Sequence, residues 1–388
     1  MNRSLSLPTQ RYYRIAVSVF YFIQGIVFAS WASRIPDIQA RLQLNDAALG
    51  GVLFAMPTGQ LMAMMLSGYL VSRYGSKPML TAGALLYPAT LVLLGLAGTV
   101  VQLSGALFLF GITGNLSNIS VNTQGVQVER LYRRSIMASF HGLWSLAGFA
   151  GGLTATAMVA AEVKPWRHFV VICLLSWLLV VAFRPCLVPR DARPEGELKA
   201  KRRWVRPDAF IFTLGLIAFA CMICEGTMFD WTGIYFEKIV QTPKALSRVG
   251  YIAFTFTMAG GRFVSDTFVA RYGVKRILQF SGITIVGGML LAVLWPSLVP
   301  ATIGFLLVGI GTSSVVPLVY SLAGRSKKIP AGLALALVSS IGFLGFLLGP
   351  PLIGFLSQAT NLRVAFAFIA LLGLGTTLLA RRLNRLSR

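Results

Sequence analysis

Charged residues are scarce in this sequence. Asp, Glu, Lys and Arg make up 12% of its 388 residues, hydrophobic residues make up 56%, and the mean hydropathy is +0.73. A soluble protein of this length carries about twice that charged fraction. Since a membrane-spanning helix needs about 20 apolar residues, the chain has room for about ten to twelve such helices and none for a large soluble domain.

Acidic residues are the scarcest of the charges. The chain has 12 of them against 35 Lys and Arg, which gives a net charge of +23. Such basicity often indicates nucleic-acid binding, but here the basic residues lie in short loops between apolar runs. That pattern is typical of membrane topology, so we expect no nucleic-acid partner.

Groups suited to catalysis are also few. Cys221 and Cys224 form a C-x-x-C pair within an apolar run. A metal or redox site would need a second ligand pair or an electropositive aqueous setting, so apolar packing is the simpler interpretation. Neither His141 nor His168 has a neighbouring Glu, and no G-x-x-x-x-G-K-[ST] loop occurs. We therefore expect no enzyme, no disulfide framework, no cofactor and no ATP-driven pump.

Long apolar runs dominate what is present. They predict an all-α membrane protein of about twelve transmembrane helices in two six-helix bundles. The runs fall near 12–33, 47–70, 79–98, 101–127, 136–160, 166–187, 208–235, 245–268, 277–296, 300–323, 330–356 and 363–380.

The distribution of Lys and Arg predicts the orientation of these helices. With the N-terminus inside, 26 of the 35 basic residues fall in cytoplasmic segments, eight fall in the opposite loops, and Arg262 remains within a span. This asymmetry and the even number of spans predict an inner-membrane protein with both termini in the cytoplasm.

A central linker and a motif repeated in both halves of the sequence suggest that the chain arose by internal duplication. The charged, Pro-containing stretch 188–207 predicts a cytoplasmic linker between an N-terminal bundle, 1–187, and a C-terminal bundle, 208–388. The segment Ser72-Arg73-Tyr74-Gly75-Ser76-Lys77 is echoed by Ala270-Arg271-Tyr272-Gly273-Val274-Lys275, 198 residues later. Internal repetition of this kind is typical of transporters whose solute site lies between the two halves.

The loop after the second run carries the most specific motif. Its sequence, Gly68-Tyr69-Leu70-Val71-Ser72-Arg73-Tyr74-Gly75-Ser76-Lys77, resembles the G-x-x-x-D-R-x-G-x-[RK] loop of the major facilitator superfamily. The resemblance implies a transporter in which Arg73 belongs to a cytoplasmic gate. Ser72 replaces the acid of that motif, so the acidic half of the gate is missing here. The alternative interpretation is that Arg73 only anchors a positively charged loop.

The second half repeats the motif with changes. Arg271 takes the arginine position and is a gate residue or an anchor in the same sense. Ala270 takes the acidic position, and Asp266 takes the position of the glycine. Arg262 lies one helical turn before Asp266, so the two are expected to pair and to contribute to the gate.

Further motifs resemble the fucose-permease-like branch of the superfamily, and the resemblance extends over nearly the whole chain. They are Gly111-x-x-Gly114-Asn115-x-x-Asn118-x-x-x-Asn122, Phe140-His141-Gly142-Leu143-Trp144-Ser145, Glu225-Gly226-x-x-x-Asp230-Trp231 and Gly345-x-x-x-Gly349-Pro350-Pro351. The resemblance implies a bacterial inner-membrane transporter. Sugar–proton members of that branch often have acids in the first and fourth spans, where this chain has amides instead.

Acids within the spans are the candidates for proton coupling. An ionisable group at the centre of a span costs roughly 2.5–3.5 kcal/mol, so it is rare unless it is used or paired. Asp266 has Arg262 nearby, whereas Glu225 has no basic residue in its own span and Asp230 lies nearer the outer face. Loss of water disfavours a charged carboxylate, which suits a group that loads and unloads a proton. We predict Glu225 as the proton carrier, with Asp230 and His141 as further candidates; a neutral hydrogen-bonding role is the alternative.

Amides mark the predicted solute site. Asn118 and Asn122 are four residues apart and share a helix face, and Asn115 lies one turn earlier. Such a stripe can bind a polyol or an amide-bearing solute, or it can hold helices together. With Gln24 and His141, it forms the predicted substrate site.

Tryptophans complete that site. Trp144 and Trp231 are predicted to stack on the solute. For Trp31 and Trp231, which lie near the ends of their spans, a position in the aromatic belt at the membrane interface is the alternative.

Together these patterns predict a proton-coupled secondary transporter, a symporter, that moves a small polar organic solute by alternating access, with sugar-like solutes among the candidates. Efflux of a drug or metabolite is the alternative, because the second span is rich in Met. A channel or a non-transporting sensor is a remote alternative. The expected partners are the solute, protons and the lipid bilayer, and the expected state is a monomer.

Overall fold

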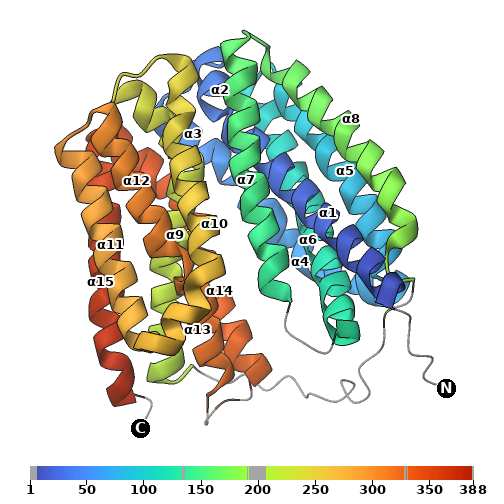
Figure 1. Cartoon of the computed structure of the whole chain (residues 1–388). Coiled ribbons are helices and arrows are strands. Elements are labelled where there is room, and N and C mark those ends of the chain that lie inside the picture. The colour runs from blue at the N-terminus through green and yellow to red at the C-terminus, as the bar shows by residue number, and fades with distance from the viewer. Residues whose placement is uncertain are drawn as a thin grey trace. The chain divides into compact units, whose positions relative to one another are not determined.

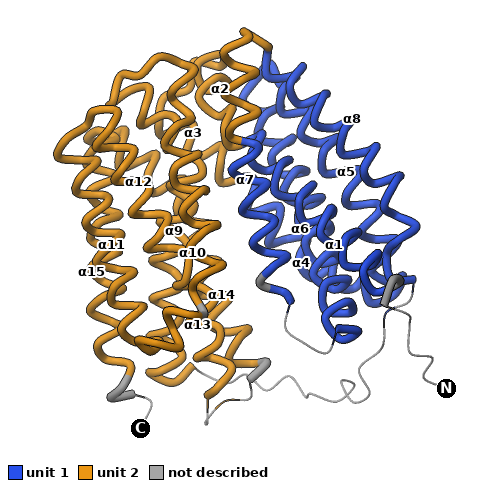
Figure 2. Tube along the Cα trace, viewed as in Figure 1, with its two compact units in different colours: residues 1–31, 55–151, 164–205 blue, residues 32–54, 152–163, 206–388 orange. Residues whose placement is uncertain are grey.

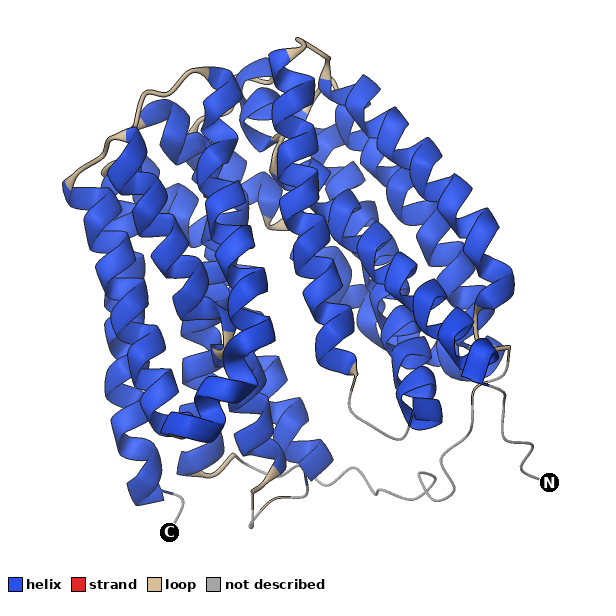
Figure 3. Ribbon diagram, in the orientation of Figure 1, coloured by secondary structure: helices blue, strands red, loops and turns tan. Residues whose placement is uncertain are grey.

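The protein is built from helices. The structure, a computed structural model, describes residues 7–132, 136–189, 191, 207–326, 329 and 331–386. Helices account for almost all of this described part, and no strand occurs in it (Figure 3). This agrees with the apolar runs, because a chain in lipid must satisfy its backbone hydrogen bonds within each segment.

The chain forms two compact units, which Figure 2 colours separately. Unit 1 consists of residues 1–31, 55–151 and 164–205. Its α-helices, labelled in Figure 1, are α1 (Leu7–Ala32), α4 (Ala55–Tyr74), α5 (Ser76–Leu96), α6 (Val100–Tyr132), α7 (Met137–Ala160) and α8 (Pro165–Phe183). The short η1 (Arg184–Cys186) follows α8. The last turns of α7 belong to the second unit.

Within unit 1, α4 and α6 approach each other closely through two glycines. A Cβ atom on Gly59 would collide with the backbone carbonyl of Phe108, and one on Gly111 would collide with that of Met56. Since lipid supplies no hydrophobic drive between helices, such contacts between small residues are how membrane helices associate.

Unit 2 consists of residues 32–54, 152–163 and 206–388. Two short helices from the first half of the sequence lie here, α2 (Ile35–Arg41) and α3 (Asp46–Leu53). The other elements are α9 (Ala209–Lys238), η3 (Lys244–Arg248), α10 (Val249–Tyr272), α11 (Val274–Leu294), α12 (Leu298–Ser313), α13 (Val315–Gly324), α14 (Ala331–Ala359) and α15 (Leu362–Leu386).

The first-half segment 32–54 is packed tightly into unit 2. A Cβ on Gly50 of α3 would lie 2.7 Å from the carbonyl oxygen of Pro350, and one on Gly354 would lie 2.5 Å from that of Asp46. The predicted halves, 1–187 and 208–388, therefore do not coincide with the compact units. Most of the predicted linker 188–207 lies outside the described residues.

Eleven helical segments of the described chain are long and apolar enough to cross a membrane. They match eleven of the twelve apolar runs. The breaks between α3 and α4 and between α12 and α13 fall inside predicted runs, whereas the break between α1 and α2 falls at the end of the first run. The remaining run is α10, a helix of 24 residues that carries Arg262 and Asp266. The count of twelve transmembrane helices stays a prediction.

The repeated loops have the same backbone and the same local contact. Gly75 and Gly273 both adopt a left-handed conformation, with φ values of 90° and 81°, immediately before α5 and α11. Only glycine adopts such angles without strain. The guanidinium of Arg73 lies 5.4 Å from the ring centre of Tyr74, and that of Arg271 lies 5.4 Å from that of Tyr272. The structure therefore supports the repeat that the sequence suggests.

Candidate functional site

Unit 1 brings part of the predicted substrate site together. The Tyr21 hydroxyl on α1 donates a hydrogen bond of 2.8 Å to Asn122 Oδ1 on α6. Asn122 Nδ2 in turn donates to Asn118 Oδ1 at 3.2 Å. The Tyr21 ring meets His141 of α7 edge to face, with 5.4 Å between ring centres. We call Tyr21, Asn118, Asn122 and His141 the amide cluster.

The amide cluster combines a rigid centre with an accessible side. Tyr21 is 1% exposed and also stacks on Phe140 at 5.4 Å. Asn118 and His141 are exposed in the structure, and Asn122 is half-buried. Since Tyr21 holds Asn122 against α1, the amide stripe of α6 faces neighbouring helices at this point. The cluster therefore presents amide and imidazole groups that can exchange hydrogen bonds with a polar solute.

The other predicted amides lie deeper. Gln24 is 6% exposed and donates to the Gly114 carbonyl oxygen at 3.4 Å. The Oε1 atom of Gln24 and the Oδ1 atom of Asn115 are buried without a hydrogen-bond donor among the described residues. A buried acceptor without a donor is costly, so each of these oxygens is suited to accept a hydrogen bond from a water or a ligand.

The tryptophans occupy protein interiors. Trp31 is 1% exposed and Trp231 is 0% exposed, and neither indole N–H has an acceptor in the described part of the chain. These two residues therefore do not form an aromatic belt at the membrane surface. Trp144 is half-buried and packs on Phe28 with ring centres 5.9 Å apart.

Unit 2 contains a charged pair in the middle of two helices. Arg262 Nη2 of α10 lies 3.9 Å from Glu225 Oε1 of α9, and the Cys221 thiol lies 3.7 Å from the same oxygen. Glu225 is 16 residues after Ala209 and 13 before Lys238, the ends of α9. Glu225 has no basic residue in its own span, and the structure places a basic partner beside it from α10.

The remaining predicted acids differ in environment. Asp230 is 4% exposed, so it is buried rather than half solvated as the sequence suggested. The side chain of Asp266 lies outside the described residues, and its predicted pair with Arg262 stays a prediction.

The predicted gate arginine Arg73 contacts aromatic side chains of its own helix. Its Nη1 donates to the Tyr69 hydroxyl at 2.5 Å. Ser72 replaces the acid of the motif, but an acid from another part of the sequence contacts the same loop. Asp191, from the start of the linker, accepts hydrogen bonds of 2.6 Å from the backbone N–H of Ser76 and 2.5 Å from its hydroxyl. A carboxylate at the first turn of a helix is stabilised by the helix dipole and the unpaired N–H groups there. Sequence reasoning missed Asp191, because it is remote from the loop in sequence.

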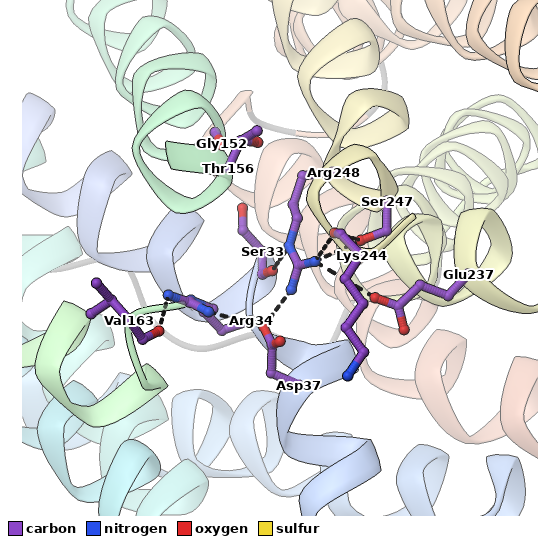
Figure 4. A network of polar contacts seen from close by, with 10 residues as sticks. All are labelled: Ser33, Arg34, Asp37, Gly152, Thr156, Val163, Glu237, Lys244, Ser247 and Arg248. Carbon is purple, nitrogen blue, oxygen red and sulfur yellow. Dashed lines mark hydrogen bonds and ion pairs between the residues drawn. The ribbon is translucent and has the colours of Figure 1, made fainter. Parts of the chain in front are cut away.

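Sequence reasoning also missed the Arg248 network, the set of contacts around Arg34, Asp37, Glu237 and Arg248 (Figure 4). Arg248 donates to Asp37 and, through Nε, to the Ser33 carbonyl oxygen at 3.0 Å, and its Nη1 lies 3.6 Å from Glu237. Arg34 lies 3.3 Å from the same Asp37 carboxylate and donates to the Val163 carbonyl at 2.8 Å.

The two guanidinium groups of this network are buried, and both contact carbonyl and carboxylate oxygens. Arg34 is 2% exposed and Arg248 is 1% exposed. Asp37 serves both guanidinium groups, so one carboxylate joins α2 to the start of α10. In the sequence, Arg34 and Arg248 were used only as markers of membrane topology. The acids Asp37, three residues after Arg34, and Glu237, eleven residues before Arg248, could have indicated that the arginines are paired.

A second group of polar contacts fastens α3 to unit 2. Asp46 accepts hydrogen bonds of 2.6 Å from Lys238, 2.6 Å from Ser357 and 3.0 Å from Gln39. The first-half segment 32–54 is thus tied to the end of α9, to η3 and to α14 by charges and hydrogen bonds as well as by close packing.

Metal chemistry has no support in these contacts. No group of three or more His, Cys, Asp or Glu residues suited to a metal ion occurs in the part of the chain that the structure describes. Cys221 and Cys224 are buried and unbridged, as apolar packing residues would be. The described residues thus include a cluster of polar side chains in unit 1 and a charged pair within the helices of unit 2.

Comparisons with known proteins agree with this picture. The sequence pattern described as Major Facilitator Superfamily matches residues 17–330. An uncharacterized MFS-type transporter of Yersinia pestis is 33% identical over 96% of both chains. The fold is similar to that of a variant of the nucleoside transporter NupG, with a TM-score of 0.75, 14% identity and coverage of 96% of this chain and 99% of the other.

A second solved structure shares the fold. It is a bacterial homologue of the human lysosomal transporter Spinster in an inward-facing, occupied conformation, with a TM-score of 0.70, 15% identity and 98% coverage of both chains. At these identities the structural likenesses show the fold alone, whereas the sequence pattern covers most of the chain. The chain is therefore a multi-pass membrane transporter that belongs to the major facilitator superfamily.

Proposed function

We propose that this protein is a secondary active transporter that moves a small polar organic solute across the inner membrane by alternating access, coupled to protons. In this proposal it is a monomer with twelve transmembrane helices and both termini in the cytoplasm. Its motifs support membership of the fucose-permease-like branch. The absence of a phosphate-binding loop from the sequence supports an ion gradient as the energy source.

The observation that carries the proposal is the attachment of the first-half segment 32–54 to the second half. Alternating access needs a contact between the two sequence halves that closes one end of the protein and can be released. The Arg248 network and the contacts of Asp46 supply such a contact, because they join helix ends by ion pairs and hydrogen bonds. With the N-terminus of α1 in the cytoplasm, its other end lies outside, so these contacts would lie on the outer side.

The amide cluster supports a polar solute. Asn118, Asn122 and His141 offer donors and acceptors beside the aromatic ring of Tyr21. A solute with hydroxyl or amide groups can exchange hydrogen bonds with such groups, whereas an apolar solute cannot. Glu225 supports proton coupling, because it is a carboxylate near the middle of α9 whose ion pair with Arg262, at 3.9 Å, is longer than a hydrogen bond.

The decisive experiment is solute counterflow in proteoliposomes. A thermal-shift screen of sugars, nucleosides and organic acids on the purified protein first supplies candidate solutes. We expect a hit to show counterflow, and to accumulate when an inward proton gradient is imposed. A channel gives no counterflow, so uptake without counterflow would exclude a carrier.

Efflux of an apolar compound is the second candidate. Met62, Met64 and Met65 of α4 are 68%, 49% and 72% exposed in the structure, and flexible Met side chains adapt to varied apolar ligands. The same screen separates the two candidates, since efflux of this kind predicts hits among lipophilic cations and drugs rather than among polar solutes.

A further inference from the structure

We infer that Asp230 of α9 binds the ammonium group of an amine-bearing solute, and that the Tyr251 hydroxyl of α10 takes part in the same site. The inference rests on the proposed function and deepens it by naming the charge of the solute. Both residues belong to unit 2, so the site lies within one compact unit.

Asp230 is a buried acid without a counter-ion. It is 4% exposed and lies well inside α9, 21 residues after Ala209 and eight before Lys238. No hydrogen bond or ion pair joins its carboxylate to another residue of the described chain. A buried carboxylate is stable only when a cation or a proton neutralises it.

Other acids of unit 2 provide the contrast. Three of them have basic partners, in the pairs Asp37–Arg248, Asp46–Lys238 and Glu225–Arg262. Asp230 has no such partner among the described residues, so the described part of the chain does not supply its counter-ion.

The Glu225–Arg262 pair lies apart from Asp230. Asp230 comes five residues after Glu225, which places the two side chains about 140° apart around α9. Arg262 comes 11 residues after Tyr251, and this separation is about 16 Å along α10. Arg262 is therefore not the counter-ion of Asp230, and the two acids occupy different sites.

Tyr251 supplies the second polar group. It is 2% exposed, and its hydroxyl is buried without a hydrogen-bond partner in the described part of the chain. Tyr251 is close enough to Asp230 to interact electrostatically, yet no hydrogen bond joins them. One group that donates to both the carboxylate and the hydroxyl oxygen can satisfy the two residues together.

The Tyr251 ring is held in place by its neighbours. Its centre lies 6.1 Å from that of the Phe229 ring, next to Asp230 in the sequence. A Cβ on Gly152 would lie 3.1 Å from Tyr251 Cδ1, so α7 also packs closely on this ring. These contacts limit how far the hydroxyl can turn away from Asp230 toward another partner.

An ammonium group matches this arrangement. It carries a positive charge and several N–H donors, so it neutralises Asp230 and can also donate to the Tyr251 hydroxyl. The rings of Tyr251 and Phe229 add the attraction of aromatic faces for cations. A neutral hydroxyl of a solute would leave the charge of Asp230 uncompensated.

A metal ion matches it less well. Hard cations take about six or more oxygen ligands. No group of three or more His, Cys, Asp or Glu residues suited to a metal occurs among the described residues. The chemistry of the site therefore favours an organic cation.

Paired probes test the inference without knowledge of the natural solute. Each pair is an amine and its uncharged analogue, ethanolamine with ethylene glycol and glucosamine with glucose, added to the purified full-length protein at neutral pH and equal ionic strength. We expect an amine to raise the thermal midpoint by about 2–5 °C, whereas its analogue gives no rise. Asp230→Asn should not respond to the amine, and Tyr251→Phe should show a smaller rise than the wild type.

A second carboxylate provides the matched control. Glu162 is exposed and belongs to the same unit, so Glu162→Gln should respond to the amine as the wild type does. If Asp230→Asn does not fold, Tyr251→Phe carries the comparison, because it removes the hydroxyl and keeps the ring. The inference is overturned if neither amine stabilises the wild type, or if the site variants respond as the wild type does; a proton would then be the group that neutralises Asp230.

Failure of this site is distinguishable from failure of the transport proposal. Counterflow of an uncharged solute by a protein that does not respond to amines would uphold the transporter and exclude the amine site. Stabilisation by an amine that depends on Asp230, without counterflow of any solute, would uphold the site and exclude the carrier.

Discussion

Arg248 at the end of η3 binds Asp37 of α2, a residue 211 positions earlier in the chain. The same Asp37 carboxylate lies 3.3 Å from Arg34. Two arginines that are almost fully buried therefore share one acid, at the point where a first-half segment meets the second half of the sequence.

Removal of the Asp37 carboxylate should destabilise the Arg248 network more than removal of the Glu237 carboxylate. We expect Asp37→Asn to lower the free energy of unfolding by about 3 kcal/mol, because both buried guanidinium groups lose their shared counter-ion. Glu237→Gln is the matched control, since Glu237 lies near one of the two arginines, 3.6 Å from Arg248, and is 24% exposed. Thermal unfolding of the purified variants measures both effects, and an equal loss in the two would contradict the central role of Asp37.

A reversible covalent lock should stop transport. Asp46 and Ser357 are 2.6 Å apart at their side-chain oxygens, so the pair Asp46→Cys/Ser357→Cys places two thiols near each other for a test of disulfide formation. If release of α3 from α14 is part of the cycle, we expect oxidation to abolish counterflow and a reductant to restore it. The two single variants under the same oxidant control for other effects. Undiminished counterflow by fully cross-linked protein would show that this contact stays closed throughout.

Glu225→Gln should separate exchange from accumulation. The Gln variant can still transport while solute occupies the site, because Gln preserves shape and hydrogen bonding. It cannot carry the proton, so a proton gradient can no longer drive uptake. We therefore expect counterflow to persist and proton-driven accumulation to be lost. Uphill uptake like that of the wild type, with the same pH dependence, would remove Glu225 from the mechanism.

Substitution in the amide cluster should affect binding rather than folding. We expect Asn118→Ala to raise the solute concentration for half-maximal transport by about tenfold, which is the loss of one or two hydrogen bonds to the solute. Thr123→Ala is the control on the same helix, because the Thr123 hydroxyl bonds only its own helix, at the Ile119 carbonyl, among the described contacts. Transport curves and thermal midpoints distinguish the cases: a fall in stability without a change in half-saturation would assign Asn118 to helix packing.

Several features could be predicted from local sequence. The helices follow from apolar runs of bilayer length, and Gly75 and Gly273 follow from loops that only glycine fits. In the structure, Asn118 and Asn122 lie beside His141 through Tyr21, and their role in binding a solute stays a prediction. Tyr21 itself was not predictable, because an aromatic residue in an apolar run gives no local sign of a polar partner.

The sequence by itself determined which residues are costly in a membrane: Glu225, Asp230 and Arg262 stand out because a charge in an apolar run is rare. Only the tertiary structure decided their partners. Glu225 pairs with Arg262 across two helices, and Asp37 pairs with Arg248 across most of the chain. Hydropathy and periodicity determine where a helix begins and which face it buries. The neighbour it packs against, and the register of that contact, depend on side chains far apart in sequence that fit together only in the folded protein.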